Sequence, residues 1–193
     1  MIPLWLKIAY TIVVAVILAV YFVKIGPKNY LWFSDIALIL TGVALWLESP
    51  LLAGMMAVGL LLPETVWNLS YFAGLLTGKP IGGVASYMFD QDKPHYLRAL
   101  SLFHVFLPVV LVWLVWRLGY DPDAWVAQTV LAGIVLPLTY VLTEPEENIN
   151  KVYGPLDKPQ TRVPPLVYLG LLMLALVLLV YLPTHLLLRA LFS

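Results

Sequence analysis

The sequence contains no cysteine and few charged residues, and each shortage excludes a class of protein. Without cysteine, the chain can form no disulfide, no thiolate metal site and no cysteine nucleophile. Charged residues make up only 11% of the chain, and the 11 basic and 11 acidic side chains cancel. The chain therefore lacks the electrostatic footprint of a nucleic-acid-binding protein, and we expect no nucleic-acid partner.

Apolar residues dominate what remains. They account for 62% of the chain, and the mean hydropathy is +0.91. A soluble domain of this size would then expose a very large apolar surface. The first apolar run reaches Lys24 without a small-residue cleavage site and is longer than the core of a signal peptide. The composition predicts an integral membrane protein whose first apolar segment is a retained helix.

Six segments are apolar and long enough to cross the roughly 30 Å of bilayer hydrocarbon as helices. The predicted fold is all-α, a polytopic membrane protein with six transmembrane helices in a single domain, residues 1–193. Residues 78–98 are expected to form an interfacial loop, with Tyr87, Met88 and Phe89 facing inward, and residues 143–164 a polar loop. The spans are predicted at about residues 3–23, 30–47, 51–76, 99–118, 124–142 and 165–188.

Basic residues in the short loops predict the orientation, because cytoplasmic loops carry an excess of lysine and arginine. An even number of spans places both termini on one face, together with Lys7, Arg117 and Arg189. The other eight basic residues, from Lys24 to Arg162, fall on the opposite face. We therefore expect a multi-pass protein of the cell inner membrane, with long loops in the cytoplasm and both termini facing outward.

Polar residues inside the predicted spans gather toward the loop-rich face. Glu64, Asn68 and Tyr71 follow one another at helical spacing in the third span and so share one stripe, while Pro63 is expected to bend that helix. An ionised carboxylate in hydrocarbon costs about 3 kcal/mol, so Glu64 is expected to face the bundle interior and a partner. The other residues expected at this cavity are Ser34, Asp35, Thr41, Ser101, His104, Thr139, Tyr140 and Glu144.

One hypothesis for this cavity is an enzyme. Thr41 or Ser34 would be the nucleophile, and His104 would accept its proton as general base. Asp35 or Glu64 would orient the imidazole. The substrate would be a lipid ester that enters sideways from the bilayer.

The competing hypothesis is a non-catalytic membrane protein. Its cavity would bind a lipid or a small apolar ligand, as an accessory protein, or pass protons through Glu64 and His104, as a transporter. In either hypothesis Asn68 would contribute its amide, to an oxyanion or to a ligand. The ligand-binding residues would be Ser34, Asn68, Tyr71, Ser101, Thr139, Tyr140 and Glu144.

No metal or cofactor is expected. Carboxylates and His104 are suitable ligand types. However, His95 lies in a predicted loop and His185 lies at the far face, so a zinc site with several histidines is not available.

A loop motif precedes the last predicted span. It reads N-x-N-x-x-x-G-x-L-x-K-P and, with a polar residue in the second span and a histidine early in the fourth, it resembles small bacterial six-helix membrane proteins of uncharacterised function. The chain is also faintly similar to the androgen-induced family of intramembrane threonine hydrolases, which cleave fatty acid esters of hydroxy fatty acids, and to related acyltransferases. That resemblance implies a threonine and a histidine on separate helices, which Thr41 and His104 match by helix order alone. The motif residues are Asn148, Asn150, Gly154, Leu156, Lys158 and Pro159.

Overall fold

The structure is a computed structural model that describes residues 1–155 and 158–192. Helices make up 78% of it, and the described part contains no strand. The predicted all-α class is therefore confirmed. Leu156 of the loop motif lies outside the described residues.

Eight α-helices are described along the chain. They are α1 (Leu4–Lys24), α2 (Phe33–Leu47), α3 (Pro50–Thr77), α4 (His95–Leu100), α5 (Phe103–Leu118), α6 (Ala124–Leu142), α7 (Pro165–Ala175) and α8 (Leu182–Phe192). Short 3₁₀ turns lie between them: η1 (Pro27–Leu31), η2 (Ile81–Gly83), η3 (Ser86–Phe89) and η4 (Ile149–Lys151). A π-helical turn, η5 (Leu176–Tyr181), joins α7 to α8.

Five helical segments of the described chain are long and apolar enough to cross a membrane. The second predicted span is shorter than expected, since α2 has 15 residues and is about 22 Å long at 1.5 Å per residue. It begins late because Trp32 has extended backbone angles and separates α2 from η1. The five segments are Leu4–Lys24, Pro50–Thr77, His95–Leu118, Ala124–Leu142 and Pro165–Phe192.

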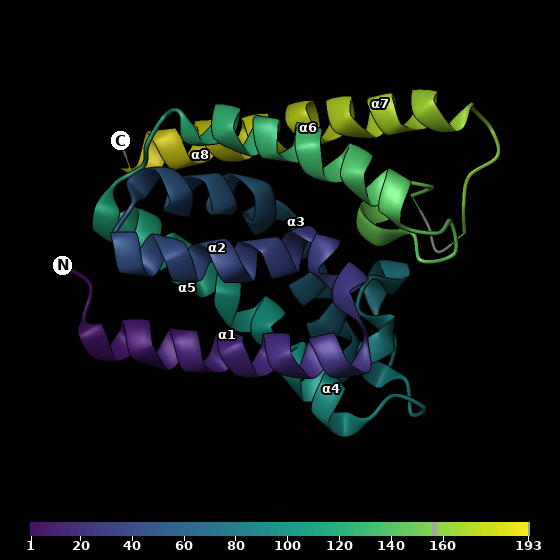
Figure 1. Cartoon of the computed structure of the whole chain (residues 1–193), viewed down its shortest axis with the longest axis horizontal. Helices are drawn as coiled ribbons and strands as arrows, with labels where there is room; N and C mark the ends of the chain where they lie inside the picture. Colours follow the sequence, from purple (N-terminus) through teal and green to yellow (C-terminus); the bar gives the residue numbers. More distant parts are fainter. Residues whose placement is uncertain (156–157, 193) are drawn as a thin grey trace.

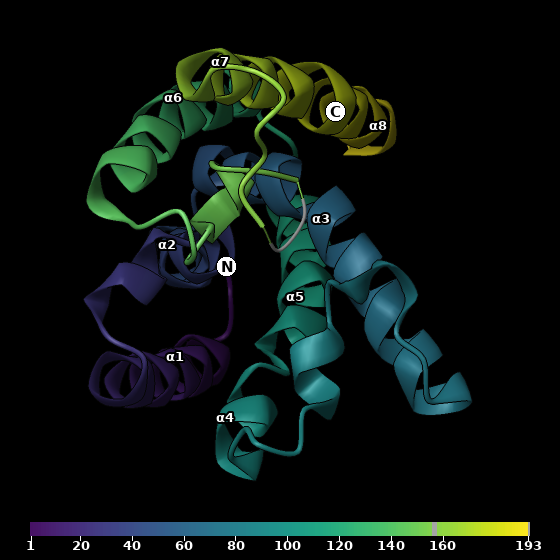
Figure 2. The ribbon, with the colours of Figure 1, turned by 90° about the vertical axis from the view of Figure 1, so that its right-hand side faces the viewer.

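The helices are layered around α3. α1 lies on one side of the bundle and α6 with α7 and α8 on the other, with α2, α3 and α5 between them (Figures 1 and 2). Small residues let α3 approach α6 closely. A Cβ added at Gly54 would lie 2.9 Å from Cβ of Ala124, and one at Gly59 would lie 2.6 Å from the amide of Gln128. These glycines allow α3 to pack at the centre.

Both chain termini lie at one end of the bundle (Figure 1). Glu48, in the turn between α2 and α3, accepts hydrogen bonds from Lys7 Nζ at 2.8 Å and from the Ile2 backbone N–H at 3.0 Å. These two hydrogen bonds, from Lys7 first, lower the pKa of Glu48. Near the other terminus, the Tyr120 backbone N–H donates to the Phe192 carbonyl at 3.3 Å.

Large apolar side chains cover the outer surface of the long helices. Soluble proteins bury such a surface because its exposure to water is unfavourable. An apolar outer face is instead typical of helices that contact lipid. Examples on three helices are Val13, Val16, Val130, Ile134, Leu178 and Leu179.

The last two helices form one continuous rod through the π turn (Figure 1). In a π turn the backbone hydrogen bond joins residues five apart instead of four, so the turn holds one residue more than an α-helical turn. From its last residue onward, the inward face of the rod is formed by Tyr181, Thr184, His185 and Leu188, all of which are buried. Their helical spacing shows that α8 presents a single stripe to the bundle.

Candidate functional site

α3 and α5 bring a carboxylate and an imidazole together inside the bundle. His104 Nδ1 lies 2.9 Å and 2.8 Å from the two carboxylate oxygens of Glu64. Glu64 is buried, while the His104 side chain keeps 14% of its surface exposed. A carboxylate accepts from Nδ1–H, so in the neutral form of the ring Nε2 is the nitrogen with the free lone pair. Nε2 has no hydrogen-bond partner among the described residues.

Two aromatic rings hold the imidazole from both sides. The Trp67 ring lies 4.6 Å from the His104 ring at an interplanar angle of 22°, and the Phe103 ring lies 4.1 Å away at 25°. Trp67 stacks in turn on Tyr71, with ring centroids 5.2 Å apart. The rings and the carboxylate together fix the orientation of the histidine.

The turn η3 covers the outer side of this stack. Met88 is buried against Trp67, and Tyr87 and Phe89 pack on the same cluster. These are the three residues that were expected to face inward. Gly74 of α3 makes the approach possible, since a Cβ there would clash with the Phe89 ring.

Asn68 satisfies a carbonyl that a proline leaves without a donor. Pro108 lies inside α5 and has no N–H, so the His104 carbonyl four residues earlier loses its usual helical partner. Asn68 Nδ2 donates to that carbonyl at 2.7 Å and to the Glu64 carbonyl at 2.8 Å. Both amide hydrogens are thus engaged. Asn68 holds the two helices together and has no N–H left to offer an oxyanion.

α1 and α2 add further polar groups beside the pair. Asp35 is buried, its Oδ1 has no partner in the described part of the chain, and its carboxyl group interacts electrostatically with Glu64. Ser101 Oγ lies 3.0 Å from the Tyr21 hydroxyl and donates to the Leu97 carbonyl at 3.1 Å. The result is a buried polar cluster in which only one of two carboxylates is paired with the histidine.

The two predicted nucleophiles do not join this cluster. Thr41 is fully buried beside Tyr10, and its Oγ1 has no hydrogen-bond partner within the described chain. The Tyr10 hydroxyl instead donates to the Leu38 carbonyl at 2.9 Å. Ser34 is half-buried in the first turn of α2. No described contact brings either hydroxyl to His104, so the predicted threonine–histidine or serine–histidine couple is not assembled.

Thr139, Tyr140 and Glu144 belong to a second cluster at the end of α6. Thr139 Oγ1 donates within its own helix at 2.8 Å. The Tyr140 ring packs on Tyr153, with centroids 5.0 Å apart. The Glu144 backbone N–H donates to Glu147 Oε2 at 2.7 Å. These three residues lie apart from the histidine.

The loop motif ties this second cluster to the start of α2. Asn150 Oδ1 accepts from the Phe33 N–H at 3.0 Å, and its Nδ2 donates to the Leu31 carbonyl at 2.7 Å. Asn148 Nδ2 donates to the Gly154 carbonyl at 2.9 Å. A Cβ at Gly154 would lie 2.6 Å from a backbone oxygen. The motif residues therefore shape the loop.

An apolar groove opens one helical turn from the Glu64–His104 pair. Its volume is about 640 Å³. Leu61 precedes Glu64 by three residues and Pro108 follows His104 by four, so both lie on the helix faces that carry the pair. From Pro108 to Trp116 the groove follows α5 for about 12 Å. Its lining consists of Leu61, Thr65, Pro108, Val109, Val112, Trp113, Trp116 and Phe192.

Trp67, Phe103 and Tyr21 are the cluster residues that the sequence analysis missed. The sequence carries a signal for Trp67, because it follows Glu64 by three residues and precedes Tyr71 by four, on the polar stripe of α3. The other tryptophans lie near the ends of the predicted spans. Phe103 and Tyr21 carry no comparable signal, since adjacent and distant aromatic residues are common in apolar helices.

The described residues contain no group of three or more histidine or acidic side chains that could hold a metal ion. Comparison of the chain with protein-family models, curated proteins and solved structures finds no match. What the site can do therefore follows from its own geometry.

Proposed function

We propose that the protein is a six-pass integral membrane protein that binds a membrane lipid in the groove and acts on an ester of that lipid, as a hydrolase or acyltransferase. His104 is the general base. The observation that carries the proposal is the imidazole held at Nδ1 by Glu64, 2.8 Å away, at the head of an apolar groove.

The membrane arrangement rests on the helix lengths and the apolar outer surface. Five described segments have the length and composition of membrane spans. α2 is the sixth span in this proposal. It packs against α1, α3 and α5, so protein rather than lipid surrounds this short helix on several sides. The long, lysine-rich loops face the cytoplasm of the cell inner membrane, as the excess of basic residues favours.

The absence of native cysteine makes this topology simple to test. Single cysteines replace exposed residues, Asp123 at the terminal end and Gln91 and Thr161 at the loop end. In intact cells, a membrane-impermeant maleimide should label Asp123→Cys, whereas Gln91→Cys and Thr161→Cys should react only after permeabilisation. Labelling of Gln91→Cys and Thr161→Cys from opposite sides would contradict six spans. Labelling of these two cysteines in intact cells, with Asp123→Cys reacting only after permeabilisation, would show the opposite orientation.

The proposed reaction uses a nucleophile that comes from outside the chain. The free Nε2 of His104 accepts a proton from water, or from the hydroxyl group of an acceptor lipid, as that oxygen attacks the ester carbonyl carbon. The bond from this carbon to the leaving oxygen then breaks, and the imidazolium returns its proton to the leaving alkoxide. Glu64 stabilises the transient positive charge on the ring. The acyl chain lies in the groove, whose lining is almost entirely apolar.

A lipid-ester assay of matched histidine variants tests the chemistry. Purified protein in nanodiscs is incubated with ester lipids, and released fatty acid or transferred acyl product is measured by mass spectrometry. His104→Gln should abolish turnover, because the amide cannot accept the proton. His95→Gln, in an exposed residue that contacts Arg98, is the control and should retain it. Turnover that survives in His104→Gln would refute the catalytic role. Labelling of Thr41 or Ser34 by a fluorophosphonate would instead place the nucleophile in the protein.

Non-catalytic lipid binding is the second candidate function. It is favoured by the engaged amide of Asn68, which leaves no donor for an oxyanion. In this case Val112→Trp, which fills the groove, should release lipid that co-purifies with the wild-type protein, while no ester product forms in either. Native mass spectrometry of the two proteins distinguishes this candidate from the enzyme.

A further inference from the structure

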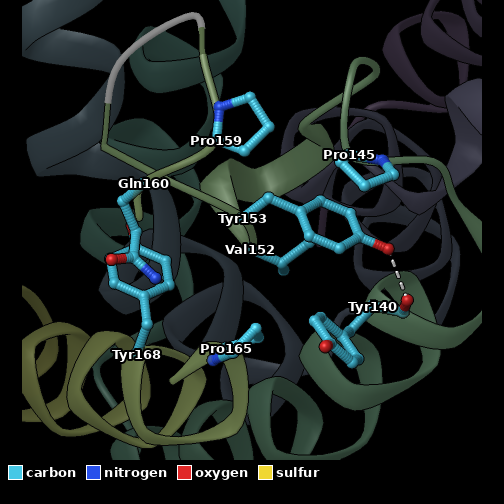
Figure 3. Close-up of a pocket in the computed structure, with 8 residues that line it drawn as sticks. All are labelled: Tyr140, Pro145, Val152, Tyr153, Pro159, Gln160, Pro165 and Tyr168. Atoms are coloured by element: carbon cyan, nitrogen blue, oxygen red, sulfur yellow. Dashed lines mark hydrogen bonds between the residues drawn. The ribbon is translucent and has the colours of Figure 1, made fainter. Parts of the chain in front are cut away.

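A second cavity lies between the end of α6, the start of α7 and the loop that joins them (Figure 3). Its volume is about 180 Å³. Figure 3 shows Tyr140 and Tyr153 on one side of the cavity and Tyr168 with Gln160 on the other. Three tyrosines and three prolines supply most of the lining, which consists of Tyr140, Pro145, Val152, Tyr153, Pro159, Gln160, Pro165 and Tyr168.

Most polar atoms of this lining are already used within the protein. The Tyr153 hydroxyl donates to the Tyr140 and Thr143 carbonyls. The Tyr168 hydroxyl donates to the Lys151 carbonyl at 3.0 Å. Gln160 Nε2 donates to the Val163 carbonyl at 2.9 Å, and its Oε1 accepts two backbone N–H groups. The cavity therefore offers mainly the faces of aromatic and proline rings to a ligand, and few hydrogen-bonding groups.

The backbone around the cavity is held in place by the loop motif. Asn148 Oδ1 accepts from the Tyr153 N–H at 3.0 Å, and the Gln160 N–H donates to the Tyr153 carbonyl at 2.9 Å. The close approach at Gly154 brings it against the backbone of Lys158 and Gln160, on the other side of this loop. The ring faces are thus pre-positioned, which lowers the entropic cost of binding.

Negative charge lies beside the aromatic faces. Burial raises the pKa of Tyr153, and the nearby carboxylates of Glu144 and Glu147 raise it further. Both carboxylates are exposed, and Glu147 is paired with Lys28 at 2.8 Å, so they attract a cation at the ring only weakly. At the outer edge, Lys158 and Arg162 are exposed and adjoin the lining residues in sequence. The attraction for a cation therefore comes mainly from the tyrosine ring faces of the lining, and the basic residues lie outside them.

The volume suits a small organic cation. A cavity of about 150 Å³ accommodates benzene, which has more heavy atoms than a trimethylammonium group. A quaternary ammonium ion needs no hydrogen-bond acceptor and binds the faces of aromatic rings. The exposed apolar residues beside the cavity, Val141, Leu166 and Val167, offer a surface for acyl chains.

We propose that this cavity binds the quaternary ammonium group of a choline headgroup carried by a membrane lipid. The trimethylammonium group lies against the tyrosine rings, and the phosphate faces Lys158 and Arg162. The site is formed by elements other than α3 and α5, which carry Glu64 and His104. It therefore goes beyond the proposed ester chemistry and does not depend on it.

Calorimetry with phosphocholine tests the recognition of charge. The wild-type protein, in a detergent without choline, should bind phosphocholine and choline. The neutral choline analogue in which carbon replaces nitrogen has the same shape and should bind at least about tenfold more weakly. Equal binding of the two would overturn the proposal, because the cavity would then recognise apolar bulk alone. This comparison needs no variant and so cannot be confused with misfolding.

Matched tyrosine variants test the ring. Tyr168→Phe keeps the aromatic face and loses only the hydrogen bond to Lys151, so it should bind phosphocholine within about threefold of wild type. Tyr168→Leu removes the face and should weaken binding about tenfold. Similar affinities for the two variants, at equal thermal stability, would refute the aromatic site. His104→Gln should leave binding unchanged, which separates this site from the proposed ester chemistry.

The source of the headgroup is tested with vesicles. Phosphatidylcholine vesicles should compete with phosphocholine, whereas phosphatidylethanolamine vesicles, whose headgroup lacks the methyl groups, should compete at least about tenfold less well. If phosphocholine binds and neither vesicle competes, the ligand is a soluble choline compound and the lipid assignment is wrong.

Discussion

The side-chain amide of Asn68 lies 2.7 Å from the carbonyl oxygen of His104, at the one position in α5 where a proline four residues later removes the helical donor. The contact joins the centre of α3 to the first turn of α5. It therefore sets the position of the imidazole relative to Glu64, which lies one turn before Asn68.

A double-mutant cycle should reveal this compensation. Asn68→Ala leaves the His104 carbonyl without a donor and should lower the free energy of unfolding by about 1–3 kcal/mol. In a Pro108→Ala background the backbone N–H of residue 108 satisfies the same carbonyl, so the cost of Asn68→Ala should fall. Unfolding in mixed micelles measures the coupling, which should be about 0.5–3 kcal/mol. Additive effects would show that the amide does not substitute for the missing N–H.

Two Glu64 variants should differ in stability. Glu64→Ala removes the acceptor of His104 Nδ1–H and leaves a buried donor unpaired, at a cost of about 1–3 kcal/mol. Glu64→Gln keeps an acceptor oxygen at nearly the same place and should cost less. Thermal unfolding of both variants in one detergent makes the comparison. Equal losses would indicate that the carboxylate acts through packing rather than through the hydrogen bond.

Gly54→Ala should separate α3 from α6. The new Cβ would lie 2.9 Å from Cβ of Ala124 and 3.2 Å from the Tyr120 ring, and neither neighbour is the flexible end of a side chain. We expect a loss of about 1–3 kcal/mol. Gly133→Ala, on α6 and with open space around it, is the matched control. It should be neutral or stabilising by up to about 1 kcal/mol, and similar losses in both variants would contradict the close contact.

Stability should depend on pH through Glu48. Its pKa is lowered from the ordinary value of 4.5 by the hydrogen bonds from Lys7 and Ile2. A carboxyl group with a lowered folded-state pKa contributes stability above its ordinary pKa, and that contribution is lost as the pH falls through the lowered pKa. The difference in Tm between wild type and Glu48→Gln should therefore shrink from about pH 7 to about pH 3. It should also shrink in high salt, because the Glu48 side chain keeps 27% of its surface exposed to solvent.

Much of the helical architecture could be predicted from the sequence. Long apolar runs leave a membrane helix few alternatives, so five of the predicted spans appear as long apolar helices. The predicted start of α2 is too early because Tyr30, Leu31 and Trp32 continue the run of hydrophobic residues that leads into the helix. The break at Trp32 depends on Asn150, far along the chain, which binds the carbonyl of Leu31 and the N–H of Phe33.

The site was predictable where spacing alone decides it. Glu64, Asn68 and Tyr71 share a stripe by helical geometry, and His104 meets that stripe because a buried carboxylate favours a partner. Which hydroxyl approaches the histidine depends on the rotation and depth of α2 relative to α5, and no sequence pattern specifies either. Thr41 consequently lies beside Tyr10, and Thr139 and Tyr140 belong to the second cluster at the end of α6.

The π turn between α7 and α8 absorbs one residue without changing which face of the rod points inward. The Leu182 N–H donates to the Val177 carbonyl, five residues earlier, where an α-helix would use the carbonyl four residues earlier. Deleting one residue that precedes Tyr181 in Leu176–Tyr181 would therefore restore a regular α-helix and leave Tyr181, Thr184 and His185 on the inward face. A one-residue deletion at the start of α8 has no extra residue to remove, so it would rotate every later residue by about 100° around the rod and should be far more damaging.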